Sequence, residues 1–537
     1  MTCVLRATAV RALAVVLLVP LLAGCSAASA APGRPADPGA LKASGPGTSP
    51  GEATVPTPIP SPAPTPAPTP SPTPVLVPLV PVTGAWSAER SISRAARAAA
   101  IAGTGKRPRT VFVAAADLAP LAAELGVTPG PNVRARSPAD VRAALARSPG
   151  ALGILRAGDV TPDVRALAVG GLRLFGGARV RDLAAWPLLV AEPAGAVASA
   201  FDPAATWTLA AGGDVMLDRE VHRLAILEGK GPDYPWDGGT ARITGRFCCG
   251  YPGWEIVGGR RTGHAGAVRT LLRSADIALV NLEAPAPDAP TYHPTGYVFT
   301  MDPQLLAGVE RAGIDVVSLA NNHIGNAGAA GVAQTIRNLD RRGIAHAGAG
   351  RNVAAARRPA WLTAAGLRIA VLAYDGAGGL PATRASAGAA PLALDAMRAD
   401  IGSARRAGAD VVIVVPHWGR EYTDAVTTAQ RRLARALVTA GADAVLGSHS
   451  HWAGPLELVR GRPVLYSLGD LVFDLLHDER TQEGLIAELT FVGTRLAQVE
   501  LHPTLIFGGA QVNLLEADGG GDDLLRAIQG GSERLLQ

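Results

Sequence analysis

Six short apolar runs in this 537-residue sequence end in acidic, amide or imidazole side chains. One of them, "VVSLANNH", ends in Asn321, Asn322 and His323. The other five end in Asp214, in Asn281 and Glu283, in His417, in His449 and His451, and in Asp470. Each of these residues alone is well explained as a cap, a turn residue or a buried histidine. The same kind of ending after six runs indicates one shared site.

These side chains are of the types that bind divalent metal ions. Three imidazoles with carboxylate and amide oxygens suit Zn, Mn or Fe, and they suit Mg less well because Mg prefers an all-oxygen shell. His449 and His451 are two residues apart, so both point to one face of a strand or reach one cluster from a turn. The sequence therefore predicts a divalent-metal site.

The apolar runs alternate with helical patterns between about residues 205 and 510. Runs such as 367–375 and 409–419 are typical of buried strands, whereas 329–343 and 427–441 repeat apolar residues every three or four positions and end in glycine. This alternation predicts helices on both faces of a mostly parallel sheet or pair of sheets. In such sheets ligands bind outside the carboxyl ends of the strands, where all the polar residues would meet.

Two other parts of the chain also have predictable elements. The runs 484–491 and 496–507 have no helical pattern between them, so we expect antiparallel closing strands. Residues 109–117 and 151–158 are typical of short buried strands, and Ser137 followed by proline begins a helix between them.

Six ordered motifs from about Thr208 to Leu489 resemble those of the CapA family, the poly-gamma-glutamate capsule biosynthesis proteins, whose domain is similar to the calcineurin-like metallophosphoesterases. The motifs are "GGDVML", "NLEAP", "LANNH", "HWGREY", "GSHSHW" and "YSLGDLVFD". The resemblance implies a layered α/β/β/α domain. It also implies metal-dependent hydrolysis or transfer on a cell-surface polymer or its precursor, with capsule polyglutamate and phosphodiester-linked substrates both open.

The resemblance also implies roles for single residues. The implied metal ligands are Asp214, Glu283, Asn322, His417, His449 and His451. His323 is the implied proton donor. Candidate substrate contacts beside them are Asn281, Asn321, Trp418, Arg420, Glu421 and Asp470. For Trp418, packing in the core is an equal alternative. One or two divalent ions, Mn, Zn or Fe rather than Mg, would activate water near neutral pH and polarise a phosphoryl or acyl oxygen.

Three positions depart from the pattern of the metallophosphoesterases. Met216 stands where an Asp-x-His motif would supply an imidazole, and a thioether replaces it poorly on a hard metal ion. Asn326 stands three residues after His323, where an acid is usual, and Asp470 replaces a usual amide. These departures leave the number of metal ions open. They also leave open a second function, a non-catalytic polymer-binding or export-assisting module with a remnant metal site.

The first 25 residues are typical of a bacterial lipoprotein signal. Arg6 and Arg11 precede an apolar run at 12–23 that is short for a membrane-spanning helix. The run continues into "LAGC", which resembles a lipobox and implies lipidation of Cys25, with ordinary secretion as the alternative. We therefore expect an extracytoplasmic, lipid-anchored protein of the cell envelope. Its expected partners are the membrane, a cell-surface polymer or its precursor, and proteins of polymer synthesis or export.

Composition divides the chain into five parts. After the signal at 1–25, residues 26–84 are rich in Pro, Ala and Thr and predict a disordered, Pro-rich stalk. Residues 85–200 predict a small α/β accessory domain. For it, a faint resemblance to a solute-binding lobe gives little support to a receptor function. Residues 205–510 form the main domain and 511–537 a C-terminal tail.

Charge and cysteine content add two further expectations. The net charge is +5 without a basic run that contains aromatic residues, so we expect no nucleic-acid partner. Beyond the signal and Cys25, only Cys248 and Cys249 remain. Because adjacent cysteines do not easily reach ordinary disulfide geometry, we expect two free or partly buried thiols there, with a strained disulfide between the two neighbours as the alternative.

Overall fold

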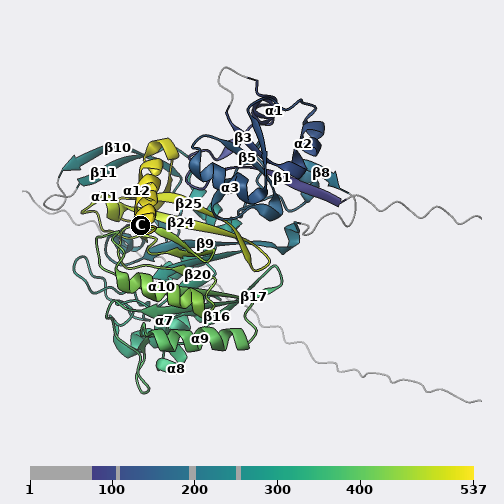
Figure 1. Ribbon diagram of the computed structural model, residues 1–537. Helices are drawn as coiled ribbons and strands as arrows, with labels where there is room; N and C mark the ends of the chain where they lie inside the picture. The colour runs from purple at the N-terminus through teal and green to yellow at the C-terminus, as the bar shows by residue number, and fades with distance from the viewer. Residues whose placement is uncertain (1–74, 105–108, 193–200, 249–254) are drawn as a thin grey trace, which may run out of the picture. The chain divides into compact units, whose positions relative to one another are not determined.

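A computed structural model describes residues 75–104, 109–192, 201–248 and 255–537 (Figure 1). The predicted signal, the lipidation site Cys25 and most of the predicted stalk lie outside these ranges. Within the ranges, no helix combines the length and apolar character that crossing a bilayer requires.

The main domain contains a ten-stranded sheet. Its strands, in spatial order, are β11 (Glu255–Arg261), β10 (Thr240–Cys248), β26 (Gln511–Leu515), β25 (Arg495–Phe507), β24 (Glu483–Val492), β9 (Thr206–Val215), β12 (Ile277–Leu282), β13 (Val316–Ser318) and β14 (Ala345–Ala347), with β23 (Asp470–Val472) also paired to β9. The strands β9, β12, β13 and β14 are parallel. β24 and β25 form antiparallel pairs, which confirms the prediction for the closing strands.

A second, six-stranded sheet faces the first. Its strands, in spatial order, are β16 (Ala360–Ala364), β17 (Leu367–Asp375), β19 (Val411–His417), β20 (Ala444–Leu446), β22 (Arg462–Leu465) and β21 (Leu456–Val459). The four inner strands are parallel, and the two edge strands are antiparallel to their neighbours. A short pair, β15 (Ala349–Gly350) and β18 (Gly388–Ala389), lies outside both sheets.

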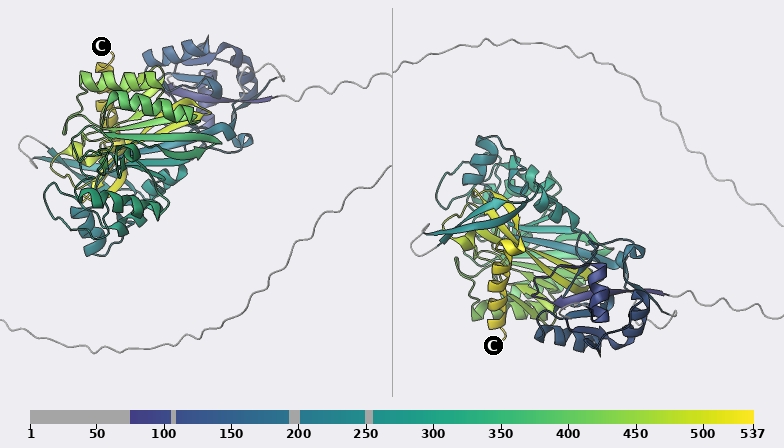
Figure 2. Two further views of the ribbon diagram at one scale, coloured as in Figure 1. Left: turned by 90° about the horizontal axis from the view of Figure 1, so that it is seen from below. Right: turned by 90° about the horizontal axis from the view of Figure 1, so that it is seen from above.

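Alternating side chains of the strands build three cores, since successive residues of a strand point to opposite faces. In β17, Ile369 and Val371 join a core that also contains Leu209 and Leu279 of the first sheet. The alternate residues of the same strand, Ala370 and Leu372, join a core under the helices of the second sheet. The two sheets therefore pack face to face, and Figure 2 shows both lying between layers of helices.

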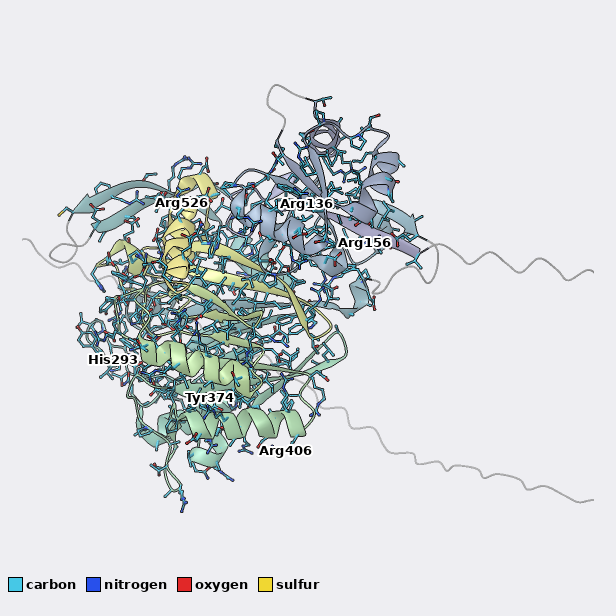
Figure 3. All side chains as sticks on the ribbon, viewed as in Figure 1. Arg136, Arg156, His293, Tyr374, Arg406 and Arg526 are labelled. Carbon is cyan, nitrogen blue, oxygen red and sulfur yellow. The ribbon has the colours of Figure 1, made fainter. Side chains whose placement is uncertain are left out.

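Helices cover the two outer faces. Those packed against the first sheet are α4 (Arg219–His222), α5 (Ala267–Ser274), α6 (Leu306–Arg311) and α7 (Gly328–Asp340). Those packed against the second sheet are α8 (Val353–Ala356), α9 (Leu394–Arg406) and α10 (Thr428–Ala440). Tyr374 lies beneath α9 and α10 and donates a hydrogen bond to Asp400 of α9 (Figure 3). The predicted layered α/β/β/α fold is confirmed.

The smaller region has its own α/β sheet within the same compact unit as the main domain. Its sheet has the order β4 (Val133–Arg136), β3 (Val111–Ala114), β5 (Leu152–Arg156), β1 (Val75–Gly84) and β6 (Val164–Ala166), with β8 (Leu189–Glu192) also on β1. Its helices are α1 (Arg94–Ala102), α2 (Leu118–Leu125) and α3 (Pro138–Arg147), and β2 (Ser91–Ile92) pairs with β7 (Ala168–Val169). Ser137 caps α3 and Pro138 stands in its first turn, as the sequence predicts.

Two predicted boundaries are wrong. Residues 75–84 were assigned to the stalk because of their prolines, but they form β1, whose Leu79 and Val82 are fully buried. Residues 511–537 are not a tail, since β26 joins the first sheet and α12 (Gly521–Arg534) packs Leu524 and Ile528 into the core between the sheets. Prolines interrupt the apolar residues of 75–84, and glycine and acidic residues interrupt those of 511–537, so composition alone does not predict either element.

Three smaller observations complete the fold. Cys248 is disulfide-bonded, so the expectation of a free thiol at that position is wrong. The remaining helix, α11 (Glu479–Gln482), leads into β24. The smaller region contacts β24 and β25 directly: Gly177 N donates to Glu488 Oε1 at 2.7 Å, and Arg173 Nη1 donates to Glu500 Oε2 at 2.8 Å.

Candidate metal centre

Strands of the first sheet deliver the carboxylates. Asp214 lies near the end of β9, opposite Asn281 of the neighbouring strand β12. Past Gly213, β9 changes its partner from β24 to β23, and Asp470 then pairs with Asp214. Glu283 follows β12 and is held by its own N–H, which donates to Val215 O at 2.8 Å. Asp214 and Glu283, near the ends of β9 and β12, therefore meet Asp470, which is the first residue of β23 and not the end of a strand as the sequence predicts.

Strands of the second sheet deliver the imidazoles. His417 is the last residue of β19, and its Nδ1 lies 2.9 Å from Ser448 Oγ. His449 and His451 follow β20 with backbone φ angles of 96° and 58°. Non-glycine residues in this left-handed region are strained and are often found at functional sites. The strain turns both rings back toward the carboxylates.

Three of the side chains form a first buried group: Glu283, His417 and His449, with one donor atom each within 4.8 Å of the others. His417 Nε2 lies 3.6 Å from Glu283 Oε1. It also lies 3.0 Å from the amide oxygen of Asn322, so Asn322 borders this group. Glu283 Oε1 and His449 Nδ1 are buried and have no hydrogen-bond partner.

Asp214, His451 and Asp470 form a second buried group of the same kind. His451 Nδ1 lies 2.9 Å from Asp470 Oδ1 and 3.9 Å from Asp214 Oδ2. Asp470 Oδ2 is buried without a hydrogen-bond partner. The sequence prediction placed Asp470 among the substrate contacts, whereas the structure puts it beside the predicted ligands Asp214 and His451.

Both groups fit divalent metal ions. Donor atoms on a tetrahedral ion with bonds of about 2.1 Å lie roughly 3.4 Å apart, which is close to the separations seen in each group. Buried polar atoms are normally hydrogen-bonded, so three unpartnered donors aimed into two clusters need an explanation. A bound cation would satisfy all of them, and the donor types are those of Mn, Zn and Fe sites.

Burial controls the charges of the cluster. It raises the pKa of Glu283 well above its usual value, and the charges of Asp214 and Asp470 raise it further. Burial also raises the pKa of Asp214, against the charge of His451. The same cause lowers the pKa of His417 well below its usual value and that of His449 to about 4. Both rings are therefore neutral at pH 7, the form in which imidazole binds metal.

His451 and Asp470 behave differently because they face each other. Burial opposes protonation of His451, but the charge of Asp470, the hydrogen bond to it and the charge of Asp214 prevail and raise its pKa to about 9. Burial raises the pKa of Asp470 to about 7, against the lowering effect of His451. Without a bound cation, this pair is an ion pair inside the protein.

The tautomer of His323 is set by Asn326. Phe299 N donates to Asn326 Oδ1 at 2.9 Å, which identifies that amide atom as the oxygen. His323 Nδ1 lies 3.0 Å from the same oxygen and must therefore donate to it. His323 Nε2 is left as an acceptor, 3.1 Å from Asn322 Nδ2. Burial lowers the pKa of His323 to about 4, so the ring is neutral at pH 7.

The candidate substrate contacts divide into inner and outer residues. Asn281 and Asn321 are buried, and Asn281 Nδ2 donates to Asp214 Oδ1 at 2.8 Å. Arg420 and Glu421 are exposed, and the charge of Glu421 contributes to the raised pKa values of Glu283 and His451.

Trp418 lies in the core of the second sheet, where its Nε1 donates to Tyr466 O at 3.0 Å. Only 3% of its surface is exposed, so it does not form a wall open to substrate. Of the two alternatives weighed from the sequence, core packing is the one that the structure supports.

Two residues near the centre were not found from the sequence. Ser448 contacts His417 from within the "GSHSHW" motif, where it stands beside the more conspicuous histidines. Arg219 forms an ion pair with Asp474, and its guanidinium lies 4.9 Å from the ring of Phe299. Phe299 in turn packs against His323, with ring centroids 4.3 Å apart.

A layered α/β domain with a histidine and carboxylate centre at its strand ends defines the class of protein. The family model described as bacterial capsule synthesis protein PGA_cap matches residues 208–475. A probable polyglutamine synthesis accessory protein of Mycobacterium tuberculosis is 30% identical over 292 residues, which cover 50% of this chain and 74% of that protein. The chain belongs to this CapA family of capsule synthesis proteins.

Two further relatives come from Bacillus. Capsule biosynthesis protein CapA of Bacillus anthracis is 33% identical over 32% of this chain, and PGA biosynthesis protein CapA of Bacillus subtilis is 35% identical over 30% of it. The chain spans less than half of their lengths, 43% and 42% respectively. Among solved structures, the calcineurin-like phosphoesterase YfkN of Bacillus subtilis matches 60% of this chain and 99% of that chain, with 13% identity and a TM-score of 0.31.

Proposed function

We propose that the protein is an envelope enzyme that hydrolyses or transfers a bond in a cell-surface polymer or its precursor, using divalent metal. The observation that carries this proposal is the pair of buried donor groups with three unpartnered atoms among them. Membership of the capsule synthesis family supports a polymer of polyglutamate type as substrate. It also supports partners from the machinery of polymer synthesis or export.

Each group of residues has its own role in the proposed reaction. Metal ions held by the two groups would supply Lewis-acid polarisation of a phosphoryl or acyl oxygen and an activated water. Asn322 bridges the first group and His323, since its oxygen faces His417 and its nitrogen faces His323 Nε2. His323 Nε2 is the atom that holds or moves a proton. Asn326 keeps that atom pointed at Asn322 by accepting from the opposite ring nitrogen.

His323 must be protonated on Nε2 before it can act as a proton donor. The neutral ring carries no proton on Nε2, and the neutral amide of Asn326 stabilises an imidazolium less than a carboxylate would. His323 therefore becomes a donor only after it takes up a proton, which an anionic substrate beside it favours. This condition suits phosphate or carboxylate groups in the substrate.

A second function is favoured by one observation. The ion pair between His451 and Asp470 neutralises part of the centre without any metal, as a remnant site would. A non-catalytic polymer-binding or export-assisting module is therefore the competing proposal.

One experiment separates the two functions. Bound metal is measured on the purified protein, and hydrolysis of a generic phosphodiester and of poly-gamma-glutamate is followed for wild type, His323→Ala and His417→Ala. The catalytic proposal expects bound metal and at least one hydrolysed substrate, with activity about 100-fold lower or more in both variants. Wild-type protein without metal, and with activity equal to both variants, would refute catalysis and support the binding module.

A further inference from the structure

We propose that Asp470 replaces the missing imidazole as a protein ligand beside Asp214 and His451, and that the two halves of the centre therefore hold different ions. The Asp214–His451–Asp470 half takes a hard ion such as Mn²⁺, and the Glu283–His417–His449 half takes a softer ion such as Zn²⁺. This inference rests on the metal centre of the proposed function but not on its catalytic activity.

Met216 is unable to serve as the ligand. Its side chain is fully buried among apolar residues of the core under α4 to α7. Its sulfur accepts a hydrogen bond from Asp218 N at 3.1 Å, so it is engaged away from the donor group. The position that an imidazole would take beside Asp214 is thus left to another residue.

The backbone places Asp470 there. Asp214 N donates to Gly469 O at 2.9 Å and Met216 N donates to Val472 O at 2.8 Å, which fixes β23 on the end of β9. A Cβ atom on Gly213 would lie 1.8 Å from Gly469 O, so this close approach requires glycine. The register then sets Asp470 directly opposite Asp214.

Charge also favours a cation at this point. Like charges directly opposite each other on neighbouring strands are destabilising. Asp214, Asp470 and Glu283 bring three carboxyl groups into the buried centre, and the nearby Arg219 is already paired with Asp474. Asp470 Oδ2 is buried there without a hydrogen-bond partner, and a bound cation would supply the missing partner.

The donor sets of the two halves differ in hardness. The half with Asp470 offers two carboxylates and one imidazole, whereas the half with His417 offers one carboxylate and two imidazoles. Carboxylate and water ligands suit Mg and Mn, while imidazole suits Zn, Cu, Fe and Ni. The replacement of an imidazole by Asp470 therefore moves one half of the centre toward harder ions.

The test is metal content after the full-length protein is loaded with Mn²⁺ and Zn²⁺ together and then dialysed. Wild type is expected to keep one of each. Asp470→Asn should keep Zn²⁺ and bind Mn²⁺ at least about 100-fold more weakly, since even outer partners of a ligand are worth 10- to 100-fold. His417→Ala should lose Zn²⁺ and keep Mn²⁺. Asp443→Asn, a buried aspartate outside the centre, is the matched control and should behave as wild type.

A spectroscopic measurement on wild type covers the case in which Asp470→Asn fails to fold. Pulsed electron paramagnetic resonance of the bound Mn²⁺ should show coupling to one imidazole nitrogen. Coupling to two imidazoles, or unchanged Mn²⁺ affinity in Asp470→Asn, would overturn the inference. Protein that binds no metal overturns the metal centre as well. Protein that binds both ions as expected but hydrolyses nothing leaves this inference standing and removes the catalytic proposal.

Discussion

Replacing Glu500 by glutamine should strongly destabilise the protein. Glu500 is a buried residue of β25, and with Glu488 and His502 it forms a group that geometry alone would also allow for a metal ion. In this protein, however, arginine side chains of the smaller region supply the positive charges around Glu500. Arg173 Nη1 donates to Glu500 at 2.8 Å, and Arg165 Nη1 lies 3.7 Å from it.

The magnitude follows from the pKa of Glu500. Burial opposes its ionisation, but His502, Arg173, Arg165 and Arg90 prevail and lower the pKa from 4.5 to about 2. A shift of about 2.5 units corresponds to roughly 3 kcal/mol in favour of the folded state. Burial lowers the pKa of Arg165 to about 10, and Glu500 opposes this shift more than any other group, so Arg165 is a buried cation at pH 7 that depends on Glu500 for compensation. Glu500→Gln leaves Arg165 buried and poorly paired. We therefore expect the free energy of unfolding to fall by about 3 kcal/mol at pH 7.

The assay is urea unfolding of wild type and Glu500→Gln followed by tryptophan fluorescence at several pH values. Because the folded-state pKa is depressed, the contribution of Glu500 is complete above about pH 4.5 and is lost as the pH falls through about 2. The difference between the two proteins should therefore shrink within this window. A difference below about 0.5 kcal/mol at pH 7, the range of ordinary surface substitutions, would refute the reasoning.

Three further substitutions test other parts of the structure. Gly213→Ala brings a Cβ within 1.8 Å of Gly469 O, so we expect thermal unfolding to show a loss of about 2 kcal/mol or more. By contrast, Gly402→Ala in α9 should gain up to about 1 kcal/mol, because the added Cβ meets only the end of the flexible Arg406 side chain, at 3.3 Å. Leu524→Ala in α12 should cost about 2–5 kcal/mol in urea unfolding, while Leu536→Ala, which is 80% exposed, should cost nothing measurable; equal effects would contradict the packing of α12. Arg219→Lys should recover less than half of the stability that Arg219→Ala loses, because lysine lacks the planar fork that contacts Asp474 and Gly296; full recovery would refute this role.

The convergence of polar strand ends was predictable because it depends on local patterns. Each run of β-branched and apolar residues predicts a buried strand, and parallel strands place their carboxyl ends at one edge. The helix α10 was equally readable, since Thr427 and Gln430 form a capping box and Gly441 ends the helix. In each of these patterns, the residues that determine the strand or helix lie within a few positions of one another in the sequence.

The features that the sequence did not predict depend on contacts between residues far apart in the chain. The place of Asp470 beside Asp214 follows from the register of β23 on β9, which joins positions far apart in the chain and leaves no local signal. The prolines of 75–84 resemble those of the preceding stalk, although Val and Leu between them are buried in β1. Trp418 follows His417 directly, but the strand turns its ring to the opposite side, into the core.

The metal centre takes its carboxylates from one sheet and its imidazoles from the other, so neither sheet contains a site by itself. In the unfolded chain the donors are scattered, and ion binding becomes strong only when the two sheets have closed on each other. Bound metal ions would therefore stabilise the packing of the two sheets against each other. The same arrangement would also mean that the ions enter the centre only where the chain folds, because the complete donor sets do not exist before the sheets have closed.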